Sequence, residues 1–304
     1  MTSQMPAQPA VRILITGASG NVGLETIREL MKHSRKQEFE VIAGIRDTIQ
    51  PGTKPEWTVQ PDGFVTLDFT KADTFRGALL GVSRVLLVRP PQLADVDVYF
   101  KPFIEAMKQA GVRQVVFLSL QGVENNPVTP HHKIEKILVE ANLPFTFLRP
   151  SFFMQNLSTI HRDEIRRQNE IFVPAGNGRT SFVDVRDIGA VAALALTSST
   201  TEHLYKGYEL TGSEALTYSE VARTLTTVLG RQITYRNPSM LRFVWRKWVK
   251  EKNPLGFTLV MLALYTVSKL GKAAKLTNET SRLLGRAPIT FRQFADDYRS
   301  VWLP

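Results

Sequence analysis

A strand-like run that ends in a glycine-rich turn and continues into a helical pattern lies near the start of the chain. Residues 11–16 are mostly apolar, and Gly17, Gly20 and Gly23 follow them before the helical pattern begins. This order suits a dinucleotide, because positions without side chains let the backbone approach a pyrophosphate while the positive end of a helix faces it. An ordinary strand-to-helix loop explains one glycine easily but explains three poorly. The segment therefore predicts a cofactor-binding turn.

The same alternation of strand and helix continues through the first half of the chain. Strand-like runs lie at 11–16, 39–45, 64–68, 85–88, 114–119 and 146–149, and helical patterns at 22–34, 72–80, 96–111 and 133–142. Short apolar strands separated by helices of about ten residues are typical of a parallel sheet covered on both faces. The predicted fold class is therefore α/β, a doubly wound parallel sheet of Rossmann type.

The regular alternation of strand and helix patterns ends after Pro150. We expect a strand at 180–185, a helix at 188–197 capped by Asp187, a strand at 207–210, and a helix at 218–229. Thr217 and Glu220 have the spacing of a capping box at the start of that last helix. These patterns predict an NAD(P)-binding domain over 1–155 that the chain re-enters at about 180–212. Residues 156–304 would form mainly a smaller, mostly helical C-terminal substrate domain.

Composition narrows the class of protein. The 304 residues include no cysteine, which excludes disulfides, catalytic thiolates and cysteine-bound metals. The five histidines lack the spacing of a metal site, so no metal is expected. The first ten residues are expected to form a frayed tail rather than a signal peptide. The apolar stretch at 255–267 is shorter than the roughly 20 residues that cross a bilayer, so we expect a cytoplasmic protein without a membrane span.

The net charge is +10, and the densest basic segment lies at 241–252. There Leu241, Val244, Trp245 and Trp248 share one face of a helix, with the cations mostly on the other face. A helix of this kind binds membrane surfaces or nucleic acid in some proteins. The alternative, which we favour, is a lid or substrate-domain helix with a basic solvated face. A phosphate-rich cofactor also suits a basic protein, and we expect no nucleic-acid partner.

The end of the second strand distinguishes NADP from NAD. A cation there accommodates the 2′-phosphate of NADP, whereas a carboxylate binds the ribose hydroxyl of NAD. Arg46 lies at this strand end and Asp47 follows it. Arg46 favours NADP(H), and Asp47 keeps NAD(H), or a plain surface ion pair, as the alternative. The other strand ends nominate further cofactor contacts: Asp68, Phe69, Val88, Arg89, Pro90 and Ser119.

Several segments together resemble a known family. They are TGASGNVG at 16–23, the strand end at Ser119, LPFTFLRP at 143–150, FMQN at 153–156, FVDVRDI at 182–188 and GRAP at 285–288 with Phe291 and Phe294. The chain is similar over nearly its whole length to the atypical short-chain dehydrogenases/reductases, in particular the NmrA-like group. This resemblance implies a Rossmann-type fold that binds NADP(H). The group contains NADPH-dependent quinone, azo-dye and triphenylmethane reductases as well as nucleotide-sensing regulators.

The chain departs from the superfamily pattern where the proton donor is expected. Standard members use a serine and a Tyr-x-x-x-Lys pair, but no tyrosine lies between Ser119 and Lys136. One alignment places His132 and Lys136 at the positions of the pair, and another places His131 where some relatives carry a lysine. His131 is therefore the first candidate for a catalytic residue and His132 the second. The alternative is that neither moves a proton, since a reduced quinone or dye can take one from water.

Together the sequence and the resemblance predict an NADPH-dependent reductase that transfers hydride to an electron-poor organic acceptor, quinone- or azo-dye-like. The alternative is a non-catalytic NADP(H) sensor that acts through a protein partner. A homodimer is the alternative to a protein partner of another kind. An epimerase of the extended branch is disfavoured because its reaction needs the tyrosine. Expected cofactor contacts are Gly17, Ser19, Gly20, Asn21, Val22, Arg46, Asp68, Phe69, Val88, Arg89, Pro90, Ser119 and Pro150, and expected substrate contacts are Phe152, Phe153 and Asn156.

Overall fold

The computed structural model describes residues 11–46 and 59–303. The chain divides into two compact units: unit 1 is Met1–Pro150 with Ile188–Glu209, and unit 2 is Ser151–Asp187 with Leu210–Pro304. The chain thus returns to unit 1 later than the expected position of about 180. The reason is that strand β9 (Arg179–Val183) pairs with the short strands of unit 2 and not with the central sheet.

In the described part of the chain, unit 1 contains a seven-stranded sheet in the order β10-β6-β5-β4-β1-β2-β3. Its strands are β1 (Val11–Ile15), β2 (Phe39–Ile45), β3 (Gly63–Thr66), β4 (Val82–Val88), β5 (Gln114–Leu118), β6 (Phe145–Pro150) and β10 (Lys206–Leu210). All neighbouring pairs from β3 to β6 are parallel. The order reverses direction between β1 and β4, which is the switch point where doubly wound sheets bind ligands. The predicted fold class is confirmed.

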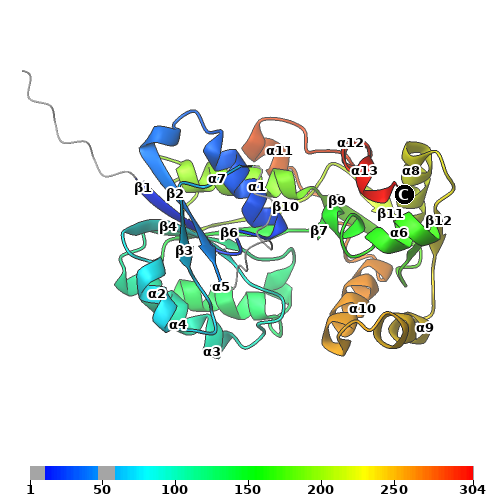
Figure 1. Cartoon of the computed structure of the whole chain (residues 1–304), viewed down its shortest axis with the longest axis horizontal. Helices are drawn as coiled ribbons and strands as arrows, with labels where there is room; N and C mark the ends of the chain where they lie inside the picture. The colour runs from blue at the N-terminus through cyan, green and yellow to red at the C-terminus, as the bar shows by residue number, and fades with distance from the viewer. Residues whose placement is uncertain (1–10, 47–58, 304) are drawn as a thin grey trace, which may run out of the picture. The chain divides into compact units, whose positions relative to one another are not determined.

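Helices cover both faces of this sheet (Figure 1). They are α1 (Asn21–Met31), α2 (Asp73–Ala78), α3 (Val96–Tyr99), α4 (Lys101–Gln109), α5 (Pro130–Glu140) and α7 (Val185–Thr197), with short turns η1 (Lys36–Glu38) and η2 (Val123–Asn125). Helices α1 and α7 lie on one face, and α2, α4 and α5 on the other. The helix expected over 96–111 is divided at Phe100, because Pro102 in the first turn of α4 has no N–H to continue the helix.

The core of unit 1 explains why its strands are continuous apolar runs. Every residue of β5 is buried, since helices cover both sides of a parallel sheet. On the α2–α5 face, Phe69, Phe75 and Phe103 pack ring to ring with centroids about 5 Å apart. On the other face α7 lies directly on α1: a Cβ at Gly189 would come within 2.7 Å of the Glu25 side chain. Gly189 therefore sets how closely these helices approach.

Unit 2 is built from short strands and helices. Its strands are β7 (Phe152–Phe153), β8 (Glu170–Phe172), β9, β11 (Ala215–Thr217) and β12 (Thr234–Arg236); its helices are η3 (Met154–Leu157), α6 (Arg162–Gln168), α8 (Tyr218–Leu229), α9 (Met240–Val244), the π-helix η4 (Trp245–Lys250), α10 (Leu255–Lys269), α11 (Glu279–Leu284), α12 (Phe291–Asp297) and α13 (Arg299–Trp302). The capping box predicted at Thr217 and Glu220 is confirmed. Helix α8 then ends at Gly230, whose φ of 66° suits glycine.

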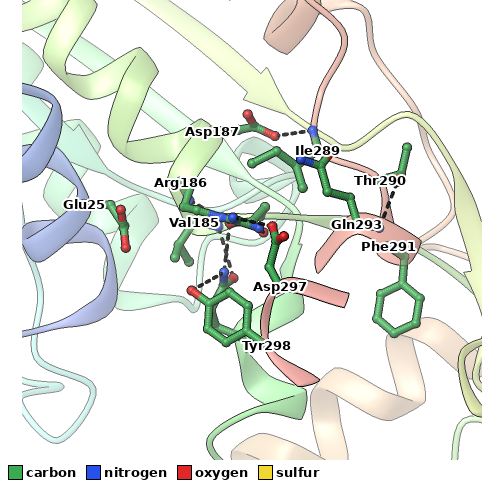
Figure 2. Close-up of polar contacts among 12 residues, drawn as sticks. Glu25, Val185, Arg186, Asp187, Ile289, Thr290, Phe291, Gln293, Asp297 and Tyr298 are labelled. Carbon is green, nitrogen blue, oxygen red and sulfur yellow. Dashed lines mark hydrogen bonds and ion pairs between the residues drawn. The ribbon is translucent and has the colours of Figure 1, made fainter. Parts of the chain in front are cut away.

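A polar network joins the end of β9 to the C-terminal helices of unit 2 (Figure 2). The fully buried carboxylate of Asp184 accepts hydrogen bonds from the Gln155 amide at 2.8 Å and from the Arg186 guanidinium at 2.7 Å. Arg186 also pairs with Asp297 at 2.6 Å and lies 5.5 Å from the Tyr298 ring centroid. These bonds compensate the cost of burying the charges and fix the position of α12.

Asp187 does not cap a helix, contrary to the sequence-based expectation. It lies inside α7, and its carboxylate is fully buried. It accepts a hydrogen bond from the Ile289 backbone N–H at 2.8 Å and pairs with Arg286 at 2.8 Å. Burial nevertheless raises the pKa of Asp187, because these two partners offset only part of the desolvation. The residue therefore anchors the segment before α12.

Replacing Asp184 with alanine should lower the free energy of unfolding by about 3 kcal/mol, because it leaves the buried Gln155 amide and part of the Arg186 charge unpaired. Urea unfolding followed by circular dichroism measures the loss. The control is Asp296→Ala, which removes the half-exposed Arg292–Asp296 pair and should cost about 0.5 kcal/mol or less. Equal losses in the two variants would contradict a structural role for the network.

Candidate functional site

The glycine turn after β1 is as tight as the sequence predicts. Gly17 has φ +59°, and a Cβ there would lie 3.0 Å from the Cβ of Val88 at the end of β4. The Gly20 N–H donates to the Gly17 carbonyl at 2.9 Å, and a Cβ on Gly23 would lie 2.3 Å from that same oxygen. Gly17 and Gly23 thus leave no room for a Cβ, and the turn lies at the switch point between β1 and β4.

The N-terminus of α1 presents backbone donors to whatever occupies the turn. Gly20 is its N-cap, no side chain caps it, and its first turn holds no acidic residue. Ser19, Gly20 and Asn21 are exposed, whereas Val22 is buried beneath them. Unsatisfied N–H groups and the positive end of the helix dipole make such a terminus a binding site for anions.

Arg46 and Asp68 follow two adjacent strands, β2 and β3. Arg46 is exposed. Although partial burial would raise the pKa of Asp68, hydrogen bonds from the Thr70 backbone and hydroxyl and the nearby Lys71 and Arg46 cations lower it. Asp68 is therefore ionised, and its carboxylate stabilises the turn that follows β3 by accepting a hydrogen bond from the Thr70 N–H at 2.9 Å. Asp47, the residue that favours NAD, lies outside the described residues.

The side chains of Phe69 and Arg89 already contact other parts of the protein. They can therefore make fewer contacts with a ligand than the sequence suggests. Phe69 packs in the core against Phe100 and Phe103, which leaves its backbone for an adenine contact. Arg89 donates to the carbonyls of Pro90, Pro91 and Leu93 at 3.0–3.1 Å. The Arg89 guanidinium thus stabilises the loop after β4. Val88 and Pro90 are partly buried beside it.

Ser119, at the end of β5, carries a buried hydroxyl with an unused hydrogen-bonding capacity. Its Oγ has no hydrogen-bond partner among the described residues, and the residue is 4% exposed. Buried polar atoms are almost always paired, so an orphaned hydroxyl at the ligand-binding edge of a parallel sheet points to a ligand. Pro150 ends the neighbouring strand β6, and its carbonyl accepts a hydrogen bond from the Gln121 N–H at 2.9 Å.

His131 is a neutral ring. It lies against Phe117 with ring centroids 6.1 Å apart, and burial together with the Arg89 cation lowers its pKa to about 3. A neutral imidazole can donate one hydrogen bond, but it is a poor acid at neutral pH. The structure therefore disfavours His131 as the general acid proposed from the sequence, and leaves it a role in orientation.

His132 and Lys136 do not form a substitute for the Tyr-x-x-x-Lys pair. The Nδ1 of His132 lies 3.0 Å from the Val123 carbonyl, which ties the start of α5 to η2. Lys136 is exposed, and its ammonium lies 3.7 Å from Glu140 on the outside of the helix. The alignment that placed these residues at the catalytic positions thus lacks support from their contacts.

The residues of unit 1 fit a dinucleotide phosphate. The glycine turn leaves room that a Cβ would fill, α1 presents free donors, Arg46 supplies an exposed cation and Ser119 an unpaired hydroxyl. The turn and the N-terminus of α1 follow β1, Arg46 follows β2 and Ser119 follows β5, and the carboxyl ends of these three strands share one edge of the sheet. Their chemistry matches a pyrophosphate, a further phosphate and a sugar or amide group.

Unit 2 contains a pocket whose wall is mostly aromatic and aliphatic. It is lined by Phe152, Asn156, Leu157, Ile160, His161, Phe182, Tyr218, Phe257, Val260, Met261, Leu264 and Tyr265. Two of the three expected substrate residues, Phe152 and Asn156, line this pocket. Phe153 does not: it pairs with Val183 in β7 and β9. Apolar walls with a few polar groups are typical of sites for small organic molecules.

A buried row of hydrogen-bonded side chains ends at this pocket, and the sequence did not predict it. His161 lies between two partners, with its Nδ1 2.9 Å from a Glu164 carboxylate oxygen and its Nε2 2.5 Å from the Tyr265 hydroxyl. The other Glu164 oxygen pairs with the ammonium of Lys247, which is 2% exposed. The His161–Glu164 spacing of three residues on one helical turn was the available signal, but Lys247 and Tyr265 lie far away in the sequence.

The basic segment at 241–252 differs from the expectation in part. Arg242, Lys250 and Lys252 are exposed as expected, but Lys247 is buried. Arg246 pairs with Glu170 at 2.6 Å and with Glu251 at 3.0 Å. Leu241 is 85% exposed and Trp245 58%, whereas Phe243 is buried. The buried Glu164 explains the position of Lys247, because its carboxylate requires a cation inside the unit. Met240, Leu241, Val244, Trp245, Trp248, Val249 and Leu262 line a shallow apolar groove.

Within residues 11–46 and 59–303, no helix has the length and apolar character to cross a membrane. In the same ranges, no group of three or more His, Cys, Asp or Glu side chains could hold a metal ion.

Comparisons with known proteins place the chain in a family. The model of the NmrA-like family matches residues 9–268, so the chain belongs to the NmrA-like family. The chain is 30% identical over 297 residues to the NAD(P)H azoreductase of Xenophilus azovorans, covering 95% of this chain and 99% of the relative. It is 31% identical over 303 residues to the agroclavine dehydrogenase of Claviceps fusiformis, covering 96% and 98%.

A solved structure shares both fold and length. The NADPH-dependent quinone oxidoreductase QOR2 of Escherichia coli, complexed with NADPH, superposes with a TM-score of 0.81 and 25% identity. The match covers 94% of this chain and 99% of that one. The predicted resemblance to NmrA-like reductases is thereby confirmed.

The neutral state of His131 predicts a flat titration. In a ¹H–¹³C spectrum of histidine-labelled protein, its ring signal should stay constant between about pH 5 and 8, because its pKa lies near 3. Loss of the signal in His131→Asn assigns it, and the urea-denatured chain should titrate near about 6.5 as a control. A midpoint near neutrality in the folded protein would contradict the burial argument.

The buried Glu164 carboxylate predicts an acid-dependent stability. Burial alone would raise its pKa, but His161 and Lys247 lower it to about 2. A depressed pKa stabilises the fold above the unfolded value of 4.5, and this stabilisation is lost as pH falls toward 2. The free energy of unfolding in urea should thus fall by up to about 1.4 kcal/mol per pH unit more in wild type than in Glu164→Gln within that window.

The control for this experiment is Glu279→Gln on the exposed Arg282–Glu279 pair. Its stability should follow the wild-type dependence on pH. Parallel curves for wild type and Glu164→Gln would show that Glu164 has no depressed pKa.

Proposed function

We propose that the chain is an NADPH-dependent reductase that transfers hydride to an electron-poor organic acceptor of quinone- or azo-dye-like structure. The observation that carries the proposal is the Gly17 turn, with the uncapped N-terminus of α1 beside Val88 at the switch point. Relatives named as an NAD(P)H azoreductase and an NADPH-dependent quinone oxidoreductase, each aligned over nearly the full length, support the same activity.

In this proposal unit 1 binds the cofactor. The backbone and side chains of Gly17, Ser19, Gly20, Asn21 and Val22 hold the pyrophosphate, and Arg46 holds the 2′-phosphate. Asp68 and the backbone of Phe69 flank the adenine. Val88, Arg89, Pro90, Ser119 and Pro150 line the rest of the cofactor site. The bound nicotinamide supplies the hydride.

Unit 2 provides the site for the acceptor. Phe152, Phe182 and Phe257 give the pocket aromatic walls, and Asn156 supplies an amide that can orient a carbonyl or azo group. Phe153 supports this wall from β7. Catalysis consists mainly of holding donor and acceptor in place and excluding water. His131 contributes as a neutral hydrogen-bond donor at the cofactor, because its pKa near 3 leaves it uncharged.

The rival function is an NADP(H) sensor that acts on a protein partner. The observation in its favour is the exposed apolar groove at Leu241, Trp245 and Trp248, which is a suitable surface for a partner helix. A sensor binds NADP(H) without turnover on any acceptor, whereas a reductase oxidises NADPH only when an acceptor is present. A homodimer through the same groove would also cover it.

Replacing Arg46 with alanine should raise the KM for NADPH by about 10- to 100-fold, because a charge-assisted phosphate contact contributes about 1.5–3 kcal/mol. The KM for NADH, which has no 2′-phosphate, should stay unchanged. The assay follows the absorbance of the reduced nicotinamide with a panel of quinones, azo dyes and enones.

The matched control is Arg223→Ala, which removes an exposed arginine of α8 and should leave both KM values unchanged. An equal KM for NADPH in Arg46→Ala and wild type would show that Arg46 does not bind the 2′-phosphate. Binding of NADPH without turnover on any acceptor would replace the reductase with the sensor.

A further inference from the structure

The wall of the unit 2 pocket is apolar except at a few positions, and two of these belong to one hydrogen-bonded chain. Tyr265 on α10 and His161 before α6 both line the pocket, while Glu164 and Lys247 lie behind them. The hydrogen bonds connect Lys247 to Glu164, Glu164 to His161, and His161 to the Tyr265 hydroxyl. A row of hydrogen-bonded polar side chains beside an apolar cavity is costly to bury, and this one places Tyr265 and His161 in the pocket wall.

The partners of His161 determine which way its protons point. Glu164 is a carboxylate, so it can only accept, and the Nδ1–H of His161 donates to it at 2.9 Å. The Nε2 of His161 is thereby turned toward the Tyr265 hydroxyl at 2.5 Å. A carboxylate on one ring nitrogen also stabilises the imidazolium, as in other His–carboxylate pairs.

Tyr265 alone is a very weak acid. Burial, followed by the neighbouring Tyr218 and the Glu164 charge, raises its pKa well above the ordinary value of 10. A free phenolate in this pocket is therefore unfavourable. The hydroxyl can still pass a proton on if it receives another from His161 in the same step.

We propose that Tyr265 is the proton donor to the reduced acceptor and that His161 resupplies its proton, in place of the missing Tyr-x-x-x-Lys pair. This inference rests on the proposed reductase function. Glu164 accepts a hydrogen bond from Nδ1 of His161 and so holds the ring with its Nε2 at the Tyr265 hydroxyl. Lys247 pairs with the second oxygen of Glu164 and holds the carboxylate in place, so that Glu164 and Lys247 act as positioning residues.

The step balances for a quinone. Hydride addition leaves a hydroquinone monoanion; the O–H bond of Tyr265 breaks as a new O–H bond forms on that oxyanion. The Nε2–H bond of His161 breaks as the Tyr265 O–H bond forms again. Once the hydroquinone has left, water in the emptied pocket returns a proton to His161 through the Tyr265 hydroxyl, because His161 is 1% exposed and both of its ring nitrogens face protein groups. A cationic triarylmethane dye differs, because hydride addition to its central carbocation gives a neutral product that needs no proton.

Other charged and titratable groups lie next to these four residues. Glu251 accepts from Lys247 at 2.9 Å, and Arg246 lies 4.0 Å from Glu164. Tyr218 packs edge-on against Tyr265, with ring centroids 5.9 Å apart. Because the proposed proton transfer goes to a quinone oxyanion, the rate of quinone reduction should depend on the Tyr265 hydroxyl, while reduction of the cationic dye should not.

The test uses Tyr265→Phe, which removes the hydroxyl and keeps the ring. With NADPH and menadione, kcat should fall about 100-fold, in the usual range for loss of a general acid. With NADPH and malachite green, kcat should change by less than about 3-fold, since no proton is transferred. Wild-type menadione turnover should slow in D₂O, and the variant should lose this isotope effect.

The matched control is Tyr235→Phe, which removes a hydroxyl that bonds the Val173 and Gly176 carbonyls at 3.1 Å outside the pocket lining. It should leave both rates and the isotope effect unchanged. His161→Gln, a second variant, should reproduce the menadione defect. Circular dichroism and the Kd for NADPH confirm that each variant is folded.

Each other outcome overturns a defined part of the argument. If Tyr265→Phe reduces menadione at the wild-type rate, or loses the same activity with both acceptors, Tyr265 only packs against the acceptor. If the wild type does not reduce malachite green, the solvent isotope effect with menadione decides in its place. NADPH binding without turnover of any acceptor by the wild type would instead overturn the proposed function itself.

Discussion

The contact between the Gly17 carbonyl and the first turn of α1 is the constraint on which the cofactor half of the molecule depends. A Cβ on Gly23 would lie 2.3 Å from that oxygen, so the helix can approach the turn only with glycine there. The same turn sits against Val88, which brings β1 and β4 together at the switch point. The free helix N-terminus, the end of β4 and the unpaired Ser119 hydroxyl all take their positions from this packing.

In unit 2 the corresponding constraint is a buried charge. Glu164 is 3% exposed, and an isolated carboxylate at that depth would be expensive. Lys247 and His161 compensate it, and this requirement turns Lys247 of the basic segment inward. Leu241, Trp245 and Trp248 stay exposed along a groove. One buried carboxylate thus accounts both for the buried lysine and for the polar side chains at the end of the pocket.

The two candidate proton donors differ in their surroundings more than in their chemistry. His131 has an aromatic neighbour and a cation beside it, so its pKa falls to about 3 and it stays neutral. His161 has a carboxylate on one ring nitrogen and a hydroxyl on the other. His131 stands next to His132 in the sequence, and His161 stands alone. Only the tertiary structure gives the two rings these different partners.

The sequence by itself determined the features that depend on local order. Apolar runs, glycine spacing and capping residues act within a few positions, and they were sufficient for the parallel sheet, the Gly17 turn, the capping box at Thr217 and the strand-end position of Arg46. Tertiary structure alone decided the roles of residues whose partners are remote. Lys247 and Tyr265 are far from His161 in the sequence. Asp187 binds the Ile289 N–H and the Arg286 guanidinium and does not cap a helix. The physical reason is that burial and pairing of charge depend on the whole fold, whereas turns and strands follow from neighbouring residues.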